Sequence, residues 1–125
     1  MALLPAKSSS VANPMTFTTV LAQATVRDLA AAEPWYTALL GRGPDLRPMD
    51  GLLEWHLVEG SGVQVWQDPD RAGRSTVVLG VTDVDGTAQR VTAAGLEPAG
   101  PEEGGGARVV RLTDADGNLV VLVGT

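Results

Sequence analysis

The sequence contains an internal repeat, and this repeat constrains the fold more than any other feature. Two strand-like segments, VLAQATV at residues 20–26 and STVVLGV at 75–81, are each followed by a helical stretch that ends at a glycine. The halves also finish alike, since WHLVEGSGVQVWQ at 55–67 matches VRLTDADGNLVVLVG at 110–124. Self-similarity of this kind indicates one supersecondary unit used more than once. The chain is therefore predicted to contain two similar units in tandem.

Each unit is predicted to run strand, helix, strand, strand, strand. An aspartate, Asp28 or Asp83, can cap each helix, and Gly41 and Gly95 are natural C-terminal stops. Pro34 predicts either a kink or a restart of the first helix. The strands of the first unit are predicted at 16–26, 44–49, 52–58 and 62–67, and those of the second at 75–81, 96–100, 107–112 and 119–123.

Two loops in the second unit are predicted from their turn-forming residues. The polar, glycine-rich stretch 101–106 is predicted to be mobile, and DADGN at 114–118 to form a tight turn. The fold class is thus α+β, with two tandem βαβββ modules whose sheets curl around a central cavity.

The chain of 125 residues, 44% of them hydrophobic, is one domain's worth and can bury a core. Residues 1–14 are rich in Ser, Ala and Pro and are predicted to be a flexible tail. Residues 15–125 are predicted to form a single domain, with module one at about 15–68 and module two at about 74–125.

The charge and the rare residue types exclude several functions. A net charge of −6 disfavours nucleic acids and anionic membranes as partners. The absence of cysteine and a single histidine exclude a Cys/His zinc site. No apolar run approaches the ~20 residues of a membrane span, and the N-terminus does not match a secretory signal. A cytoplasmic protein is expected.

Side chains alternate across a strand, so each strand has one side towards its helix and one open side. A few polar groups in an apolar, aromatic concavity are typical of a small-molecule site. The predicted ligand-binding residues on the open sides are Leu21, Gln23, Glu54, His56, Gln64, Trp66, Thr76, Val78, Arg111 and Val121.

Within this set, His56 and Glu54 are candidate catalytic residues, because an imidazole titrates near neutral pH. Simpler roles are also open. His56 can be a solvated or structurally bonded side chain, Trp66 and Trp55 can be core residues, and Glu54 with Arg111 can form an ion pair between the sheets.

Two motifs resemble a known family. V-R-D-L-(x)5-W-Y-T-x-L-L-G at 26–41 and D-A-D-G-N at 114–118 are similar to the glyoxalase/bleomycin-resistance/extradiol-dioxygenase group, the vicinal oxygen chelate superfamily. The similarity extends over nearly all of residues 15–125. It implies paired βαβββ modules around a cavity, and frequent homodimers, some with exchanged modules.

The resemblance also locates the metal ligands of the metal-dependent members. In this chain their positions are Leu21, Gln64, Thr76 and Val121. Leucine and valine have no donor atom, whereas a hard divalent ion needs several N or O ligands. No metal and no cofactor are therefore expected.

The resemblance leaves three functions open. The first is a metal-free binding protein of the bleomycin-resistance type, holding a cationic or aromatic small molecule. The second is a metal-free isomerase, cyclase or lyase in which His56 is the acid or base, Glu54 orients it, and Arg111 or Gln64 stabilises an oxyanion. The third is an accessory dimerisation module with a filled core. A homodimer that binds a small molecule is the favoured expectation.

Overall fold

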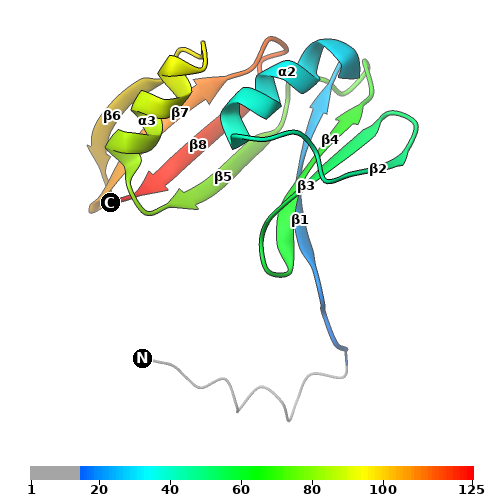
Figure 1. Ribbon diagram of the computed structural model, residues 1–125, viewed down its shortest axis with the longest axis horizontal. Coiled ribbons are helices and arrows are strands. Elements are labelled where there is room, and N and C mark those ends of the chain that lie inside the picture. Colours follow the sequence, from blue (N-terminus) through cyan, green and yellow to red (C-terminus); the bar gives the residue numbers. More distant parts are fainter. Residues whose placement is uncertain (1–14) are drawn as a thin grey trace.

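The two halves of the repeat form two separate four-stranded sheets, each with its own helix (Figure 1). The computed structural model describes residues 15–125, and the tail predicted at 1–14 lies outside them. The first module contains β1 (Val20–Val26), α2 (Leu29–Leu40), β2 (Leu46–Met49), β3 (Leu52–Val58) and β4 (Ser61–Gln67). The second contains β5 (Thr76–Val81), α3 (Val84–Ala93), β6 (Ala99–Gly104), β7 (Ala107–Thr113) and β8 (Leu119–Gly124).

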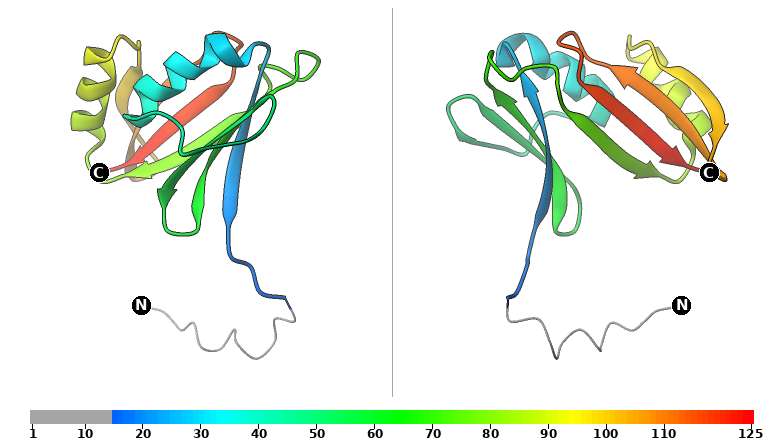
Figure 2. Two further views of the ribbon diagram at one scale, coloured as in Figure 1. Left: turned by 45° about the vertical axis from the view of Figure 1, so that its right-hand side comes forward. Right: turned by 180° about the vertical axis from the view of Figure 1, so that it is seen from behind.

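The strand orders are β1-β4-β3-β2 and β5-β8-β7-β6, so the repeat seen in the sequence is also a repeat of topology. In each sheet the first strand pairs in parallel with the last strand of its module, and the remaining neighbours are antiparallel. The α+β class and the tandem βαβββ modules are thereby confirmed. The sheets stay open, however, and do not close around a cavity within one chain (Figure 2).

Both helices lie on the same side of the molecule and leave the other face of each sheet uncovered (Figure 1, Figure 2). Asp28 and Asp83 cap them as predicted, by accepting hydrogen bonds from the N–H groups of Ala30 and Gly86. Helix α2 runs through Pro34 without interruption, so the predicted alternative of a restart is wrong. Neither helix of the described part is long and apolar enough to cross a bilayer.

Under the helices, buried side chains of both modules form one continuous hydrophobic cluster. The predicted alternation holds along most of β3 and β8, whereas in β7 the adjacent Val109 and Val110 are both buried. The cluster includes Ala24, Val26, Tyr36, Leu53, Trp55, Val63, Val65, Val77, Val91, Val110, Leu112, Val120 and Leu122.

Strand β1 begins at Val20, later than the predicted residue 16. The reason is its pairing, because Val20 lies opposite Ser61, the first residue of β4, and the residues before it have no strand beside them. By alternation Val20 lies on the same side of β1 as the buried Ala24 and Val26, but the residue is 71% exposed.

The segment predicted as a mobile loop at 101–106 is largely strand, since β6 spans Ala99–Gly104 and pairs with β7. The prediction of a strand at 96–100 with a loop after it is therefore wrong. The sequence PEEG lacks β-branched residues, but its backbone pairs with β7, and cross-strand ion pairs join Arg108 to Glu103 and Arg111 to Glu102.

The two modules are joined by buried hydrogen bonds around the DADGN turn. Asn118 donates its amide N–H to the carbonyl of Thr25 at 2.7 Å and accepts from the N–H of Ser75 at 2.9 Å. Asp114 accepts from Asn118 at 2.8 Å and from the hydroxyl of Tyr36 at 2.7 Å. The two family-like motifs therefore contact each other, which fixes the end of β1 beside the start of β5.

Candidate functional site

The open face of the first sheet carries a row of polar side chains contributed by three strands. Gln23 of β1, Gln64 of β4 and Glu54 of β3 lie opposite one another in the strand register. The Nε2 of Gln23 donates to Oε1 of Gln64 at 3.0 Å, and the Nε2 of Gln64 donates to Oε1 of Glu54 at 2.8 Å. His56 extends this row, because its Nε2 lies 2.6 Å from Oε2 of Glu54. These four residues, Gln23, Gln64, Glu54 and His56, are called the polar ladder below.

Glu54 is the centre of the polar ladder. Its side chain is only 12% exposed, whereas that of His56 is 51% exposed. The hydrogen bond from Gln64 and the second from His56 lower the pKa of the Glu54 carboxyl, against the opposing effect of its burial. Glu54 is therefore ionised at neutral pH and acts only as a hydrogen-bond acceptor.

The backbone of His56 is fixed from the edge of the sheet. A carboxylate oxygen of Asp45 accepts from the His56 N–H at 2.7 Å, and Arg42 donates both to the His56 carbonyl and to Asp45. The hydrogen bond from His56 and then that from Arg42 lower the pKa of Asp45. The sequence analysis did not identify Arg42 or Asp45. Both precede β2, whose pairing with β3 is irregular, so the alternation of side chains along a strand does not indicate where theirs lie.

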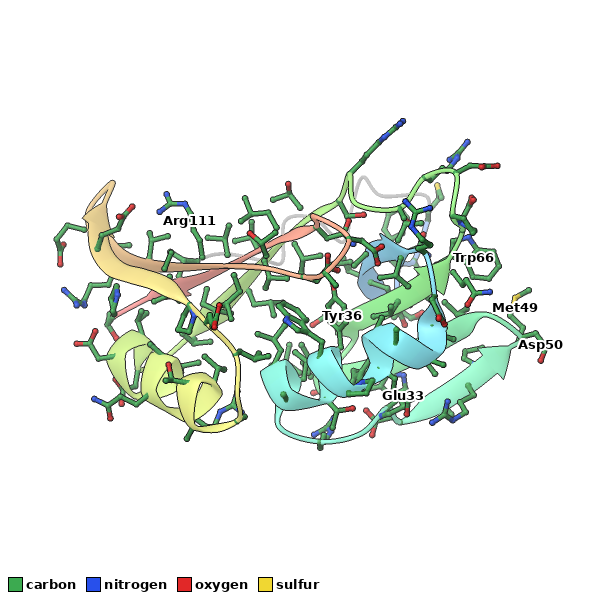
Figure 3. The ribbon with its side chains drawn as sticks, turned by 90° about the horizontal axis from the view of Figure 1, so that it is seen from above. Glu33, Tyr36, Met49, Asp50, Trp66 and Arg111 are labelled. Atoms are coloured by element: carbon green, nitrogen blue, oxygen red, sulfur yellow. The ribbon has the colours of Figure 1, made fainter. Side chains whose placement is uncertain are left out.

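Trp66 lies one row along from the polar ladder, between Thr25 of β1 and Leu52 of β3. Its ring is half-buried on the open face, whereas Trp55, on the opposite face, is fully buried in the core. Figure 3 shows Trp66 over the first sheet, well apart from Arg111 of the second. The reading of Trp55 as core is correct, and the assignment of Trp66 to a ligand site stays a prediction.

The open face of the second sheet is mostly apolar. Thr76, Val78 and Val121 lie on it, and Val78 is 60% exposed. Arg111 is the charged member of the predicted set, and it pairs with Glu102 of β6. The predicted ion pair between Glu54 and Arg111 is therefore wrong, because each has partners within its own sheet.

The strand registers show how the two modules have diverged. Gln23, Gln64 and Glu54 align in one sheet in the same way as Val78, Val121 and Arg111 align in the other. The repeat thus places a carboxylate in the first module where the second has a guanidinium. Of the predicted site residues, the structure brings together those of the first module in one cluster and leaves those of the second on a separate sheet.

Two cavities lie along the strands of the first module, and one of them borders the polar ladder. One of about 380 Å³ lies at the β3–β4 hairpin and is lined by Thr19, His56, Val58, Glu59 and Ser61 among others. A second of about 270 Å³ lies where the sheets meet, lined by residues that include Val20, Val58 and Val78. His56 therefore connects the polar ladder to a hollow in which a ligand group can sit.

The four positions that the family resemblance gives for metal ligands, Leu21, Gln64, Thr76 and Val121, carry few donor atoms in this chain. Leu21 and Val121 offer no donor atom, and the amide of Gln64 is engaged with Gln23 and Glu54. Within residues 15–125 there is also no cluster of three or more His, Cys, Asp or Glu side chains that could hold an ion. The donor set does not fit a divalent cation.

No protein-family model and no curated protein matches this sequence. Several solved structures do match it. A glyoxalase/bleomycin resistance protein from Catenulispora acidiphila is 30% identical, with a TM-score of 0.80 over 86% of this chain and 98% of that chain.

Two further solved structures share the fold at lower identity. An antibiotic binding protein from a Streptomyces species is 20% identical, with a TM-score of 0.73 over 88% of this chain and 96% of that one. A bleomycin-binding protein in complex with bleomycin is 19% identical, with a TM-score of 0.71 over 88% and 99%. With a 30% identical relative covered almost completely, the chain belongs to the glyoxalase/bleomycin resistance protein family.

Proposed function

We propose that this protein binds a small, partly planar, cationic molecule on the open face of its first module, without a metal. The observation that carries the proposal is the half-buried Trp66 beside the polar ladder with its ionised Glu54. An indole face attracts both planar rings and cations. The net charge of −6 adds a long-range attraction for a cationic ligand.

Two further observations support this proposal. The aliphatic side chains at the family's metal positions, Leu21 and Val121, favour binding without a metal. One protein of the same fold was solved in complex with bleomycin, and another is an antibiotic binding protein. A drug or antibiotic is therefore a reasonable class of ligand to test on this chain.

The direct test is a titration with bleomycin, followed by tryptophan fluorescence and by calorimetry. We expect the Trp66→Ala variant to lose both the fluorescence change and most of the affinity. The matched control is Trp35→Phe, which removes a helix tryptophan that contacts Tyr36 and leaves the open face unchanged. Absence of binding up to millimolar concentrations of bleomycin and of simple aromatic cations would overturn the proposal.

We also propose that two copies of the chain pair to cover the open faces. Val20, Val58 and Val78 are 71%, 69% and 60% exposed and line one cavity at the junction of the sheets. Clustered exposed aliphatic residues of this kind mark interaction surfaces.

Analytical ultracentrifugation tests this pairing. The wild type is expected to sediment as a dimer and Val78→Lys as a monomer, because the lysine places a charge in the apolar contact. Gln89→Lys adds the same charge on the outer side of α3 and should leave the dimer intact. A monomeric wild type would contradict the proposal.

A second candidate function rests on the 2.6 Å contact between His56 and Glu54. A carboxylate that orients an imidazole is an arrangement used in general acid–base catalysis. Arg111 lies on the other sheet and Gln64 is bonded to Glu54, so in the single chain neither predicted oxyanion partner is free beside His56. Turnover of a bound compound that survives His56→Ala would remove the histidine from such a mechanism.

A further inference from the structure

The hydrogen bonds of the polar ladder have one direction, which Glu54 imposes. Because the ionised carboxylate can only accept, Gln64 must present its Nε2 to Glu54. The Oε1 of Gln64 then faces Gln23, which must in turn present its own Nε2. The carbonyl oxygen of Gln23 is consequently left as an acceptor at the exposed end of the row.

The same constraint acts at the other end. His56 must carry its proton on Nε2 to donate to Glu54, so in the neutral imidazole Nδ1 is an acceptor. Since His56 is half exposed and lines the hairpin cavity, this nitrogen is within reach of a ligand. When His56 is neutral, each end of the polar ladder therefore presents an acceptor to a ligand, the carbonyl oxygen of Gln23 and Nδ1 of His56, with the ionised Glu54 between them, while the Gln23 amide keeps one further N–H.

The spacing of the two ends limits the kind of ligand that can use both. Gln23 lies on β1 and His56 on β3, with β4 between them, and His56 stands two residues along β3 from the position in line with Gln23, which places their Cα atoms about 12 Å apart. Trp66 lies beside the row on the same face. Trp66 and His56 lie on opposite sides of the row, so a flat ligand stacked on Trp66 can present N–H groups to the Gln23 end, and a ligand in the hairpin cavity can present them to His56.

We propose that the polar ladder selects ligands with amine, amidine or guanidine N–H donors, and that protonation of His56 weakens their binding. The inference rests on the proposed function and specifies the chemistry recognised at that same site. On protonation, Nδ1 changes from an acceptor to a donor and the imidazole gains a charge that repels a cation. Affinity for such ligands should therefore fall as the pH is lowered.

The groups around His56 support assigning the pH effect to its imidazole. Glu54 has a lowered pKa and stays ionised through the range in which imidazoles protonate. Asp45, whose pKa is also lowered, is paired with Arg42 at 3.0 Å, and the two charges offset each other. Glu59 is a further acidic side chain that borders the same cavity.

Gln64 is a positioning residue. Glu54 fixes the orientation of the Gln64 amide, and that amide in turn fixes the orientation of the Gln23 amide. Replacing Gln64 by leucine frees the Gln23 amide to rotate. We expect Gln64→Leu to weaken binding several-fold while the dependence on pH remains, since the contact between His56 and Glu54 is unchanged. His56→Ala should remove the dependence on pH.

The ligand test compares benzamidine, benzamide and benzoate, which share a ring and differ in the donor and charge of the head group. Calorimetry from about pH 8 to about pH 5 should show benzamidine bound most tightly and weakened about tenfold at the acid end, the value of one hydrogen bond to a charged group. Gln89→Ala, on the outer side of α3, is the matched control and should behave as the wild type.

A test without ligand follows the side-chain amide signals of Gln23 and Gln64 by NMR. Both should shift as His56 titrates, and Glu54→Gln should alter them because the acceptor that sets the direction is lost. Amide signals unchanged by Glu54→Gln, equal affinity for benzoate and benzamidine, or a pH dependence that persists in His56→Ala would overturn the inference. In each of these cases binding itself would stand, whereas failure of every aromatic probe and of bleomycin would overturn the proposed function.

Discussion

Gly62 is required by a close approach between two strands. A Cβ built at this position would lie 2.0 Å from the carbonyl oxygen of Trp55 on β3, so no side chain fits without moving the backbone. The residue stands in the register opposite His56, directly beside the polar ladder. The geometry of the candidate site thus depends on the absence of one methyl group.

We predict that Gly62→Ala lowers the free energy of unfolding by about 1–3 kcal/mol, the usual cost of overpacking. Gly43→Ala is the matched control, because no atom lies within 4 Å of a Cβ built there and its backbone is not in the left-handed region. Chemical denaturation of both variants measures the difference. Equal stability of the two would show that β3 and β4 can separate at little cost.

At the level of single residues, the sequence indicates faces well and partners poorly. Alternation predicts that Glu54 and His56 share one face of β3 and that Gln64 and Trp66 share one face of β4, because the period of a strand is a local property. The hydrogen bond between Gln23 and Gln64 depends on the parallel pairing of β1 with β4, two strands that are far apart in the sequence. No local pattern contains that register, which is why the polar ladder could not be predicted.

Helix α2 ends against helix α3, and the contact is made by one arginine. Arg90 of α3 donates to the carbonyls of Ala38 and Leu39, at 3.2 Å and 2.5 Å. These carbonyls belong to the last turn of α2, where no intrahelical partner is available and where a positive charge is favourable. One side chain therefore both caps a helix and joins the modules.

Loss of this cap should be measurable. We predict that Arg90→Ala lowers the free energy of unfolding by about 1–2 kcal/mol, because two carbonyls lose a charged donor. Arg74→Ala removes an equal charge from an exposed arginine to which the described part of the chain gives no partner, and should change stability little. Thermal denaturation of both variants, compared with the wild type, shows whether stability depends on the contact of Arg90 with α2 or only on the net charge.

The same elements show where sequence patterns fail. Helices α2 and α3 were predicted from capping residues and terminal glycines, which act within a few positions along the chain. The bounds of strand β6 were predicted wrongly because they are set by its pairing with β7 and not by its own composition. Elements held by distant partners carry no signal in their own residues.

At the scale of the whole molecule, a buried polar cluster joins the two modules. Tyr36 belongs to the first module, and its hydroxyl is bonded to Asp114 of the second in a site with almost no exposure. Burial, and then the hydrogen bond to the negative Asp114, raise the pKa of Tyr36 well above its usual range. The cluster therefore stabilises the folded chain only while this phenol keeps its proton.

The stability of the protein should accordingly fall in alkali. Above about pH 10 the unfolded chain ionises its tyrosine while the folded chain does not, so the free energy of unfolding should decrease by about 1.4 kcal/mol per pH unit. Tyr36 is the single tyrosine of the sequence, so tyrosinate absorbance reports this residue alone. Tyr36→Phe should show a flatter profile, and an equally steep one would assign the effect to other groups.

The contacts around Asn118 have a consequence for the two halves when they are separated. A chain cut in the exposed turn at 69–71 would leave the Thr25 carbonyl and the Tyr36 hydroxyl of one fragment without the groups that satisfy them. The other fragment would keep Asp114 and Asn118 without their partners from the first module. Each half would thus be an incomplete surface, and the two fragments should regain structure only when mixed, as a pair that reassembles by complementation.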